Sequence, residues 1–262
     1  MRRAIIKGCL LGIIFMAALI LISTIMNQGN TDMTTDMGEA AFPILSMSAE
    51  GYRVNNLHGY AESMDSAYLR DTLQPVKSDR KIAIQIDTYG RDIAQIAFEV
   101  RSLDGERLVE STEVMEYRQE GNKVVFDITL KDLIEYDAEY MLVFLVTPQD
   151  GAVIRYYTRI VLSESMHTQE KLDYITDFHE RTFDKEEAAE LTKYLESNAE
   201  GDNTTFQKVT IHSSFHQVTW GDLSVNKITE PNILIQELTE QTGSFRMEYL
   251  VSIRSGSGYQ YY

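Results

Sequence analysis

The chain contains 262 residues, of which 44% are hydrophobic, so it is long enough to bury one large core or two modest ones. Its formal net charge of −16 argues against partners that are themselves anionic, such as nucleic acids, because like charges repel. The chain has one cysteine, Cys9, which excludes an intramolecular disulfide framework.

An uncharged, proline-free run from Gly8 to Met26 dominates the N-terminal region. Its length is close to the ~20 apolar residues that a helix needs to cross a bilayer. Three cations, Arg2, Arg3 and Lys7, precede it without any acidic residue, and the positive-inside rule keeps such cations in the cytoplasm. We therefore predict that residues 1–30 form a cytoplasmic tip and a transmembrane anchor, with the bulk of the chain extracytoplasmic.

A cleaved signal peptide is the alternative to a permanent anchor. Signal peptides have an apolar core of ~7–15 residues followed by a small-x-small cleavage site. The present run is longer, and Ser23–Gly29 contains no Ala-x-Ala sequence. A lipoprotein cysteine would follow the apolar run, whereas Cys9 lies near its start. These features favour retention as an anchor in the cell membrane.

The region after the apolar run has 21 basic and 40 acidic residues, a net charge of −19, and no cysteine. A secreted eukaryotic domain would more often carry disulfides, so a bacterial cell envelope fits this composition better. The predicted partners are the lipid bilayer, contacted through Gly8–Met26, and an unknown envelope protein or glycan, but no nucleic acid.

Residues 31–163 are predicted to form a β-sandwich with an N-terminal extension. Pro43–Ser48 is compatible with a strand, and Glu50-Gly51 predicts a turn after it. Isoleucines recur at every second position in Ile82–Ile86, the period of a half-buried strand. The further predicted strands are Ile93–Ser102, Arg107–Tyr117, Val124–Leu130, Tyr140–Thr147 and Val153–Leu162. Strands at this spacing, without helical periodicity between them, indicate a sandwich.

Turn and helix signals separate these strands. Asp104-Gly105 predicts a tight hairpin, and Glu120-Gly121-Asn122 predicts another turn. A short helix is expected within Met64–Leu73, started by Asp65 and ended by Pro75.

The most specific sequence in this region is Leu133–Val143. It contains an apolar residue, a tight corner, and then Glu139-Tyr140 at the start of a long apolar strand. This pattern resembles the tyrosine corner of fibronectin type III and immunoglobulin-like modules, and the resemblance covers residues 80–162. It implies a sandwich in which the buried Tyr140 hydroxyl bonds back to the corner's backbone. The chain departs from the family because no tryptophan precedes Trp220 and the corner lacks Pro-Gly. Such folds host many functions, so the resemblance implies architecture rather than activity.

Residues 164–262 are predicted to form an α+β unit with a helical hairpin and an antiparallel sheet. Apolar residues share one face of a helix over Thr168–Arg181, and Asp184 with Glu187 starts a second helix that ends near Gly201. The predicted strands are Phe206–Ile211, Phe215–Trp220, Ile233–Ile235 and Met247–Ile253, followed by a turn that enters a strand in Ser255–Tyr262. We expect either a chain that continues past Tyr262 or a last strand that closes a sheet.

The search for chemistry predicts no catalytic residue, no cofactor site and no metal site. His212 and His216 have a spacing that binds a metal on a helix, but their segment has strand character, which places them ~13 Å apart. Trp220 and tyrosines such as Tyr259 suggest a partner-binding face, although core packing is the commoner role of such aromatics. The candidate binding surface comprises Trp220, His212, His216, Asp222 and Tyr259.

Three functions follow from these observations. The preferred one is a non-enzymatic, single-pass membrane protein that presents interaction domains in the cell envelope. The first alternative is an envelope glycan or cell-wall hydrolase whose site lies in residues 164–262, around His212, His216 and Asp222. The second is a ligand-sensing ectodomain that acts through a membrane partner, because the cytoplasmic tip is too short to signal alone.

Overall fold

The computed structural model describes residues 40–131, 133–191, 220, 225–255 and 258–261, together with residues 12, 15–19 and 22 near the N-terminus. Most of the predicted anchor Gly8–Met26 therefore lies outside the described residues. Within the described part, no helix is long and apolar enough to cross a membrane. The chain divides into one unit of residues 1–36 and a second compact unit, Met37–Tyr262, which is mainly β with few helices.

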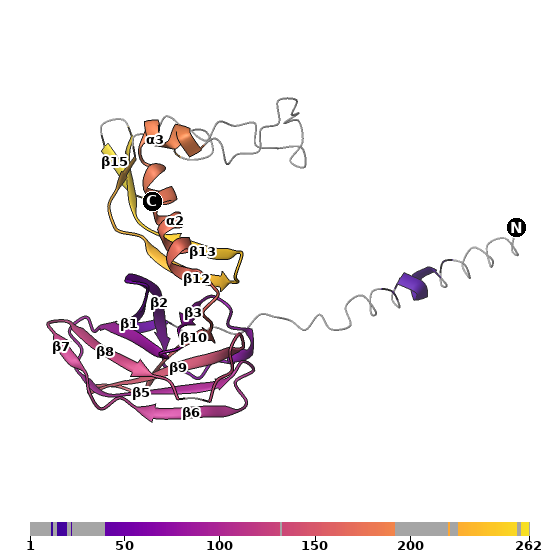
Figure 1. The fold of residues 1–262 in the computed structure, drawn as a ribbon, viewed down its shortest axis with the longest axis vertical. Coiled ribbons are helices and arrows are strands. Elements are labelled where there is room, and N and C mark those ends of the chain that lie inside the picture. Colours follow the sequence, from indigo (N-terminus) through magenta and orange to yellow (C-terminus); the bar gives the residue numbers. More distant parts are fainter. Residues whose placement is uncertain are drawn as a thin grey trace, which may run out of the picture. The chain divides into compact units, whose positions relative to one another are not determined.

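One half of the main sheet brings together strands from the start and the middle of the second unit (Figure 1). In spatial order it contains β2 (Tyr52–Tyr60), β1 (Ala40–Ala49), β4 (Lys81–Asp87), β8 (Lys123–Thr129) and β7 (Arg118–Glu120). The predicted alternation decides which face is buried: Ile82, Ile84 and Ile86 are at most 2% exposed. Strand β7 was not predicted; all three of its residues are exposed.

The other half contains the remaining predicted strands. In spatial order it contains β6 (Leu108–Glu113), β5 (Ile93–Ser102), β9 (Glu139–Pro148) and β10 (Ile154–Leu162). Short β3 (Leu73–Val76) lies parallel to the end of β10. The two halves are joined where β10 and β2 pair, through Arg155 and Tyr60.

The sheet curls so that its two halves face each other across one core. Phe126 of β8 and Phe144 of β9 are far apart in strand order, yet their ring centroids are 6.4 Å apart. Buried residues of β1, β4, β5, β8, β9 and β10 form a single hydrophobic cluster between the halves. This burial supplies the main driving force for folding, at roughly 25 cal/mol per Å² of apolar surface.

Most predicted turns are confirmed. Asp104-Gly105 connects β5 to β6, and Glu50-Gly51 connects β1 to β2. Glycine is required at both positions because Gly105 has a φ of 78° and Gly51 a φ of 83°. The predicted helix near residue 65 is a single 3₁₀ turn, η1 (Ser66–Tyr68), capped by the Asp65 side chain.

Three boundary predictions are wrong. The strand predicted over Arg107–Tyr117 is shorter, because β6 ends at Glu113. Pro75 does not end a helical segment but lies inside β3, where a proline is tolerated because this short strand pairs with β10 alone. The predicted strand Met247–Ile253 is two strands, β13 (Gly243–Glu248) and β14 (Val251–Ser255), because the chain leaves one sheet and enters another at Tyr249.

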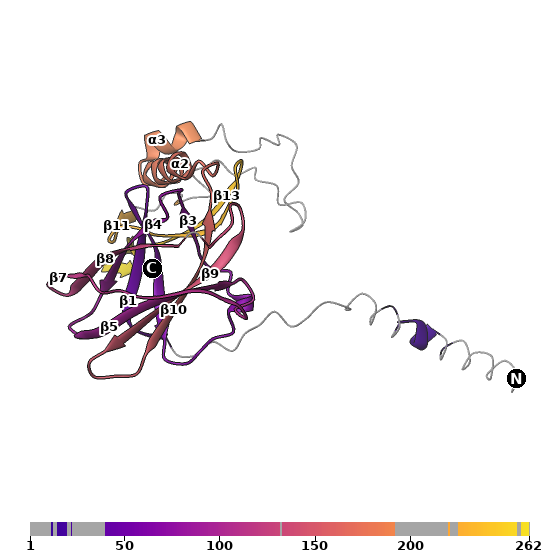
Figure 2. The same cartoon turned by 60° about the horizontal axis from the view of Figure 1, so that its bottom comes forward.

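The segment after β10 contains both predicted helix starts. Helix α2 (Thr168–Arg181) has the predicted bounds, and Asp184 caps α3 (Lys185–Glu190) by accepting from the backbone N–H groups of Glu186 and Glu187. Strands β12 (Asn232–Leu238) and β13 form a hairpin, while β11 (Val225–Lys227), β14 and β15 (Gly258–Tyr261) form a small second sheet. The predicted strands Phe206–Ile211 and Phe215–Trp220 fall almost entirely outside the described residues. Figure 2 shows α2 and α3 together beyond one end of the curled sheet.

A second core joins this segment to the sheet. Val54 and Leu73 of the sheet pack with Leu172 of α2 and with Ile233 and Ile235 of β12. Strand β12 also pairs in parallel with β2 through Ile233 and Val54. The predicted division between residues 31–163 and 164–262 therefore runs through one compact unit. The division itself stays a prediction.

Candidate functional site

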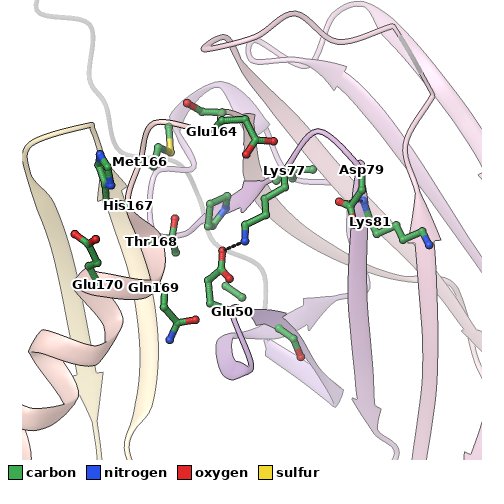
Figure 3. Close-up of a pocket in the computed structure, with 15 residues that line it drawn as sticks. Glu50, Lys77, Asp79, Lys81, Glu164, Met166, His167, Thr168, Gln169 and Glu170 are labelled. Carbon is green, nitrogen blue, oxygen red and sulfur yellow. Dashed lines mark hydrogen bonds and ion pairs between the residues drawn. The ribbon is translucent and has the colours of Figure 1, made fainter.

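A polar groove of about 370 Å³ lies where the sheet meets the start of α2 (Figure 3). We call it the junction groove. Its lining comes from three segments far apart in the sequence. They are residues 48–50 at the end of β1 and in the β1–β2 turn, residues 75–81 from the end of β3 to the start of β4, and residues 163–170, which lead from β10 into α2.

An ion pair crosses the groove between two of these segments. The Lys77 Nζ lies 2.6 Å from the Glu50 Oε1, and the Glu50 side chain is only 19% exposed. The hydrogen bond to Glu50 raises the pKa of Lys77, so the ammonium group stays charged at neutral pH. Glu50 occupies a left-handed position in its turn, with a φ of 52°, and its side chain points toward Lys77 (Figure 3).

A second carboxylate, that of Glu164, connects residues 163–170 to Ser78 in the segment between β3 and β4. The Glu164 Oε1 accepts the backbone N–H of Ser78 at 2.6 Å. Hydrogen bonding to Ser78 and the nearby charge of Lys77 lower the pKa of Glu164, so this carboxylate is ionised at neutral pH. Both carboxylates are thus held in place by partners from another segment of the chain.

The first turn of α2 opens onto the same groove. His167 precedes the helix in a left-handed conformation, and its side chain makes no capping hydrogen bond. Thr168 is 9% exposed, and Gln169 and Glu170 stand beside it in Figure 3. The groove therefore offers donors and acceptors in a fixed arrangement, the chemistry of a surface that binds a polar partner.

The structure places Trp220, a predicted surface residue, in an aromatic cluster. Its ring centroid lies 5.4 Å from that of Phe183 and 6.5 Å from that of Tyr249, and His179 lies 4.5 Å from Tyr249. Among the described residues, no hydrogen-bond partner is found for the buried Trp220 Nε1 or the buried His179 Nε2. The half-buried Trp220 thus packs against neighbouring rings.

The other four predicted surface residues lie wholly or partly outside the described residues. His212, His216 and Asp222 lie outside the described residues. The backbone of Tyr259 lies in β15, paired with Arg254, but its side chain is also outside the described part. Whether these five residues form one binding surface stays a prediction.

A smaller cavity of about 270 Å³ bears on the ligand-sensing alternative. Tyr60, Tyr157 and Leu234 contribute to its lining, and Trp220 does not. Its lining includes residues of β2, β10, β12 and β13, and among them is Tyr60, which pairs with Arg155 of β10. A deep pocket lined by Trp220 and tyrosines would favour the ligand-sensing alternative, and this cavity lacks Trp220.

Sequence reasoning missed the junction groove, although two of its parts were recognised. The Glu50-Gly51 turn and the helix starting at Thr168 were both predicted from local signals. Their proximity depends on the long-range pairing of β3 with β10, for which the sequence carries no local signal. No group of three His, Cys, Asp or Glu residues that could hold a metal occurs among the described residues. No family model and no curated protein matches the chain.

Proposed function

We propose that this chain is a non-enzymatic, single-pass membrane protein of a bacterial cell envelope. Its extracytoplasmic part would hold an immunoglobulin-like sandwich that presents the junction groove to an envelope protein or glycan. One observation carries this proposal: an apolar run that follows three cations precedes a compact β unit. The Glu50 and Glu164 carboxylates in the groove of that unit are each held by a partner residue.

The membrane assignment is supported by the sequence of the N-terminal region. Gly8–Met26 is uncharged, and Arg2, Arg3 and Lys7 precede it. Inserting such a run buries many apolar side chains, whereas moving the three cations through the bilayer would cost several kcal/mol. An orientation with a cytoplasmic N-terminus avoids this cost.

The immunoglobulin-like assignment is supported by strand order. The order β1-β4-β8-β7 in one half and β5-β9-β10 in the other corresponds to the A-B-E-D and C-F-G sheets of an immunoglobulin constant-type sandwich. A further support is the Tyr140 hydroxyl, which accepts the backbone N–H of Glu135 at 3.2 Å, the bond that a tyrosine corner requires. Strand β6, which pairs with β5, and strand β2, inserted between β1 and β10, are additions to that arrangement.

Topology is the first test. Intact cells expressing the full chain are treated with protease, and the membrane and medium fractions are blotted. We expect the extracytoplasmic part to be removed while the N-terminal part stays in the membrane. Protein in the medium that has been shortened at its N-terminus would show instead that the apolar run is a cleaved signal.

Groove variants test the binding role. Lys81→Glu and Glu170→Lys each reverse a charge at an exposed groove position, so the fold is retained. We expect both variants to lose the envelope partners that the wild-type chain captures, and Lys123→Glu, an exposed change outside the groove, to keep them. Equal capture by all variants would show that the groove does not bind these partners. Glycan turnover that is abolished by substituting His212, His216 or Asp222 would favour the hydrolase alternative.

A further inference from the structure

Two aromatic side chains stand exposed at the end of the sheet where the chain enters β1. Phe42 is 53% exposed and Tyr89 is 60% exposed, and their ring centroids are 4.8 Å apart. We call this pair the aromatic tip. Large aromatic side chains are normally buried, so an exposed pair in mutual contact calls for a role beyond the stability of the isolated unit.

The conformation of Tyr89 strengthens this point. Tyr89 and Gly90 both have positive φ, 52° and 83°, and Arg91 N–H bonds back to the Thr88 carbonyl at 3.0 Å. This is a type I′ turn, whose first central position favours Asn, Asp or Gly rather than a bulky aromatic. The local preference of the turn therefore does not account for the tyrosine.

Arg91 holds the aromatic tip in place through a hydrogen bond and an ion pair. The Arg91 Nη1 donates to the Phe42 carbonyl at 2.8 Å, and its Nη2 lies 2.9 Å from the Asp150 Oδ1. These bonds tie the start of β1, the β4–β5 turn and the β9–β10 turn to one another. They also pair the Arg91 cation with the Asp150 carboxylate.

The position of the aromatic tip along the chain points to its partner. Residues 27–39 separate the apolar run from β1, a tether of thirteen residues. Thirteen residues span at most about 45 Å. Any surface at which the apolar run is anchored is therefore within reach of Phe42.

We propose that the aromatic tip inserts into the headgroup region of the bilayer that holds the anchor. Aromatic side chains concentrate at this depth because the ring is apolar and the tyrosine hydroxyl stays hydrated. Two rings bind a membrane weakly by themselves, but the tether converts their docking into an intramolecular step with a high effective concentration. The net charge of −19 beyond the anchor directs the tip to a zwitterionic interface rather than an anionic one.

Docking of the tip would orient the junction groove. Strand β1 runs from Ala40 at the tip to Ala49 at the groove, a length of about 30 Å. A docked tip therefore points the groove away from the membrane, toward partners in the envelope. This inference rests on the membrane anchor of the proposed function.

The test uses the full chain reconstituted in phosphatidylcholine vesicles. Trp220, the only tryptophan, is replaced by Trp220→Phe, and a new reporter is introduced as Tyr89→Trp, which keeps an aromatic ring at the tip. The matched control is Tyr136→Trp, at a position 54% exposed in the connection before β9, at the end of β9 opposite to the tip. Brominated phosphatidylcholine then quenches any tryptophan in the interface.

We expect brominated lipid to quench the emission of the Tyr89→Trp chain and to leave that of the Tyr136→Trp chain unchanged. Adding Phe42→Ser should weaken the quenching by removing half of the aromatic tip. Equal quenching of both reporters, or quenching of neither, overturns the inference. Flotation of the vesicles separates this result from a failure of the anchor: chains that do not float with the lipid refute the proposed function, whereas chains that float without quenching at residue 89 refute the tip alone.

Discussion

At the residue scale, the hydrogen bond made by the Tyr140 hydroxyl contributes to the stability of the β unit. The Tyr140 side chain is 7% exposed, and its hydroxyl holds the Glu135 N–H at the entry to β9. We expect Tyr140→Phe to lower the free energy of unfolding by about 1 kcal/mol, because one buried hydrogen bond is lost. Urea unfolding of the full chain in detergent measures this change. Tyr136→Phe is the matched control, since Tyr136 is exposed, and an equal loss there would contradict the corner's role.

His179 is the second residue with a measurable consequence. It is 5% exposed between Tyr249 and Phe183, and burial lowers its pKa; Glu180 and Glu230 oppose this shift, whereas Lys227 adds to it. The unfolded chain takes up a proton at about pH 6.5, where the folded chain does not. The unfolded state therefore binds more protons below this pH, and the free energy of unfolding falls as the pH falls.

The pH dependence of urea unfolding checks the role of His179. We expect His179→Phe to flatten the decline in stability below about pH 6.5, because a side chain that cannot titrate replaces the buried imidazole. His58→Gln is the control, since His58 is exposed on β2. A decline that is unchanged in the His179 variant would place the responsible group elsewhere.

At the element scale, hydrogen bonds from Arg159 of β10 connect the β12–β13 hairpin to the sheet. It is 4% exposed, and its guanidinium donates to the Glu139 carboxylate and to the backbone carbonyls of Arg70 and Gln236. Asn55 adds a second fastening, because its Oδ1 accepts the Ile235 N–H at 2.9 Å. Together these bonds connect β9, β10 and β2 to β12.

Arg159→Met tests this fastening. We expect a loss of roughly 2–3 kcal/mol, because Glu139 and two carbonyls lose a charged donor, although Glu139 is partly hydrated. Hydrogen exchange should accelerate most in the backbone N–H groups of β12. Arg246→Met removes the 60% exposed partner of Glu248 and should change stability by less than about 0.5 kcal/mol. Equal effects of the two variants would show that burial of the ion pair is unimportant.

At the scale of the whole molecule, the second hydrophobic core makes the two predicted parts depend on each other. Leu172 of α2 is fully buried against Val54 and Leu73 of the sheet. Unfolding of one part would expose the apolar surface of the other, so we expect a single cooperative transition. Trp220 fluorescence reports on the C-terminal part, and hydrogen exchange of β5 and β9 reports on the sandwich.

Coincident urea transitions from these two probes would establish one folding unit. Leu172→Ala should lower stability by about 2–5 kcal/mol and move both transitions together. An earlier transition at Trp220, with the sandwich unchanged, would establish instead that residues 31–163 and 164–262 fold separately.

Local signals were sufficient for most elements of this protein. Alternation in Ile82–Ile86 predicted β4, the Asp104-Gly105 pair predicted the β5–β6 hairpin, and the apolar face of Thr168–Arg181 predicted α2 with its observed bounds. The Tyr140 corner was recognised because its residues are close together in the sequence. Each of these features depends on residues within about one element of one another, so the sequence contains the relevant interaction directly.

Tertiary structure alone decided how these elements meet. Pro75 ended a segment by its local preference, yet pairing with β10 places it inside a strand. The junction groove, the aromatic cluster around Trp220 and the contact of Phe42 with Tyr89 each join residues that are more than thirty positions apart. The sequence by itself determined the mainly β class, most of the strands and turns, and an apolar N-terminal run. The sites arise from long-range pairing, because contacts between distant strands depend on the register and curl of the whole sheet rather than on any local pattern.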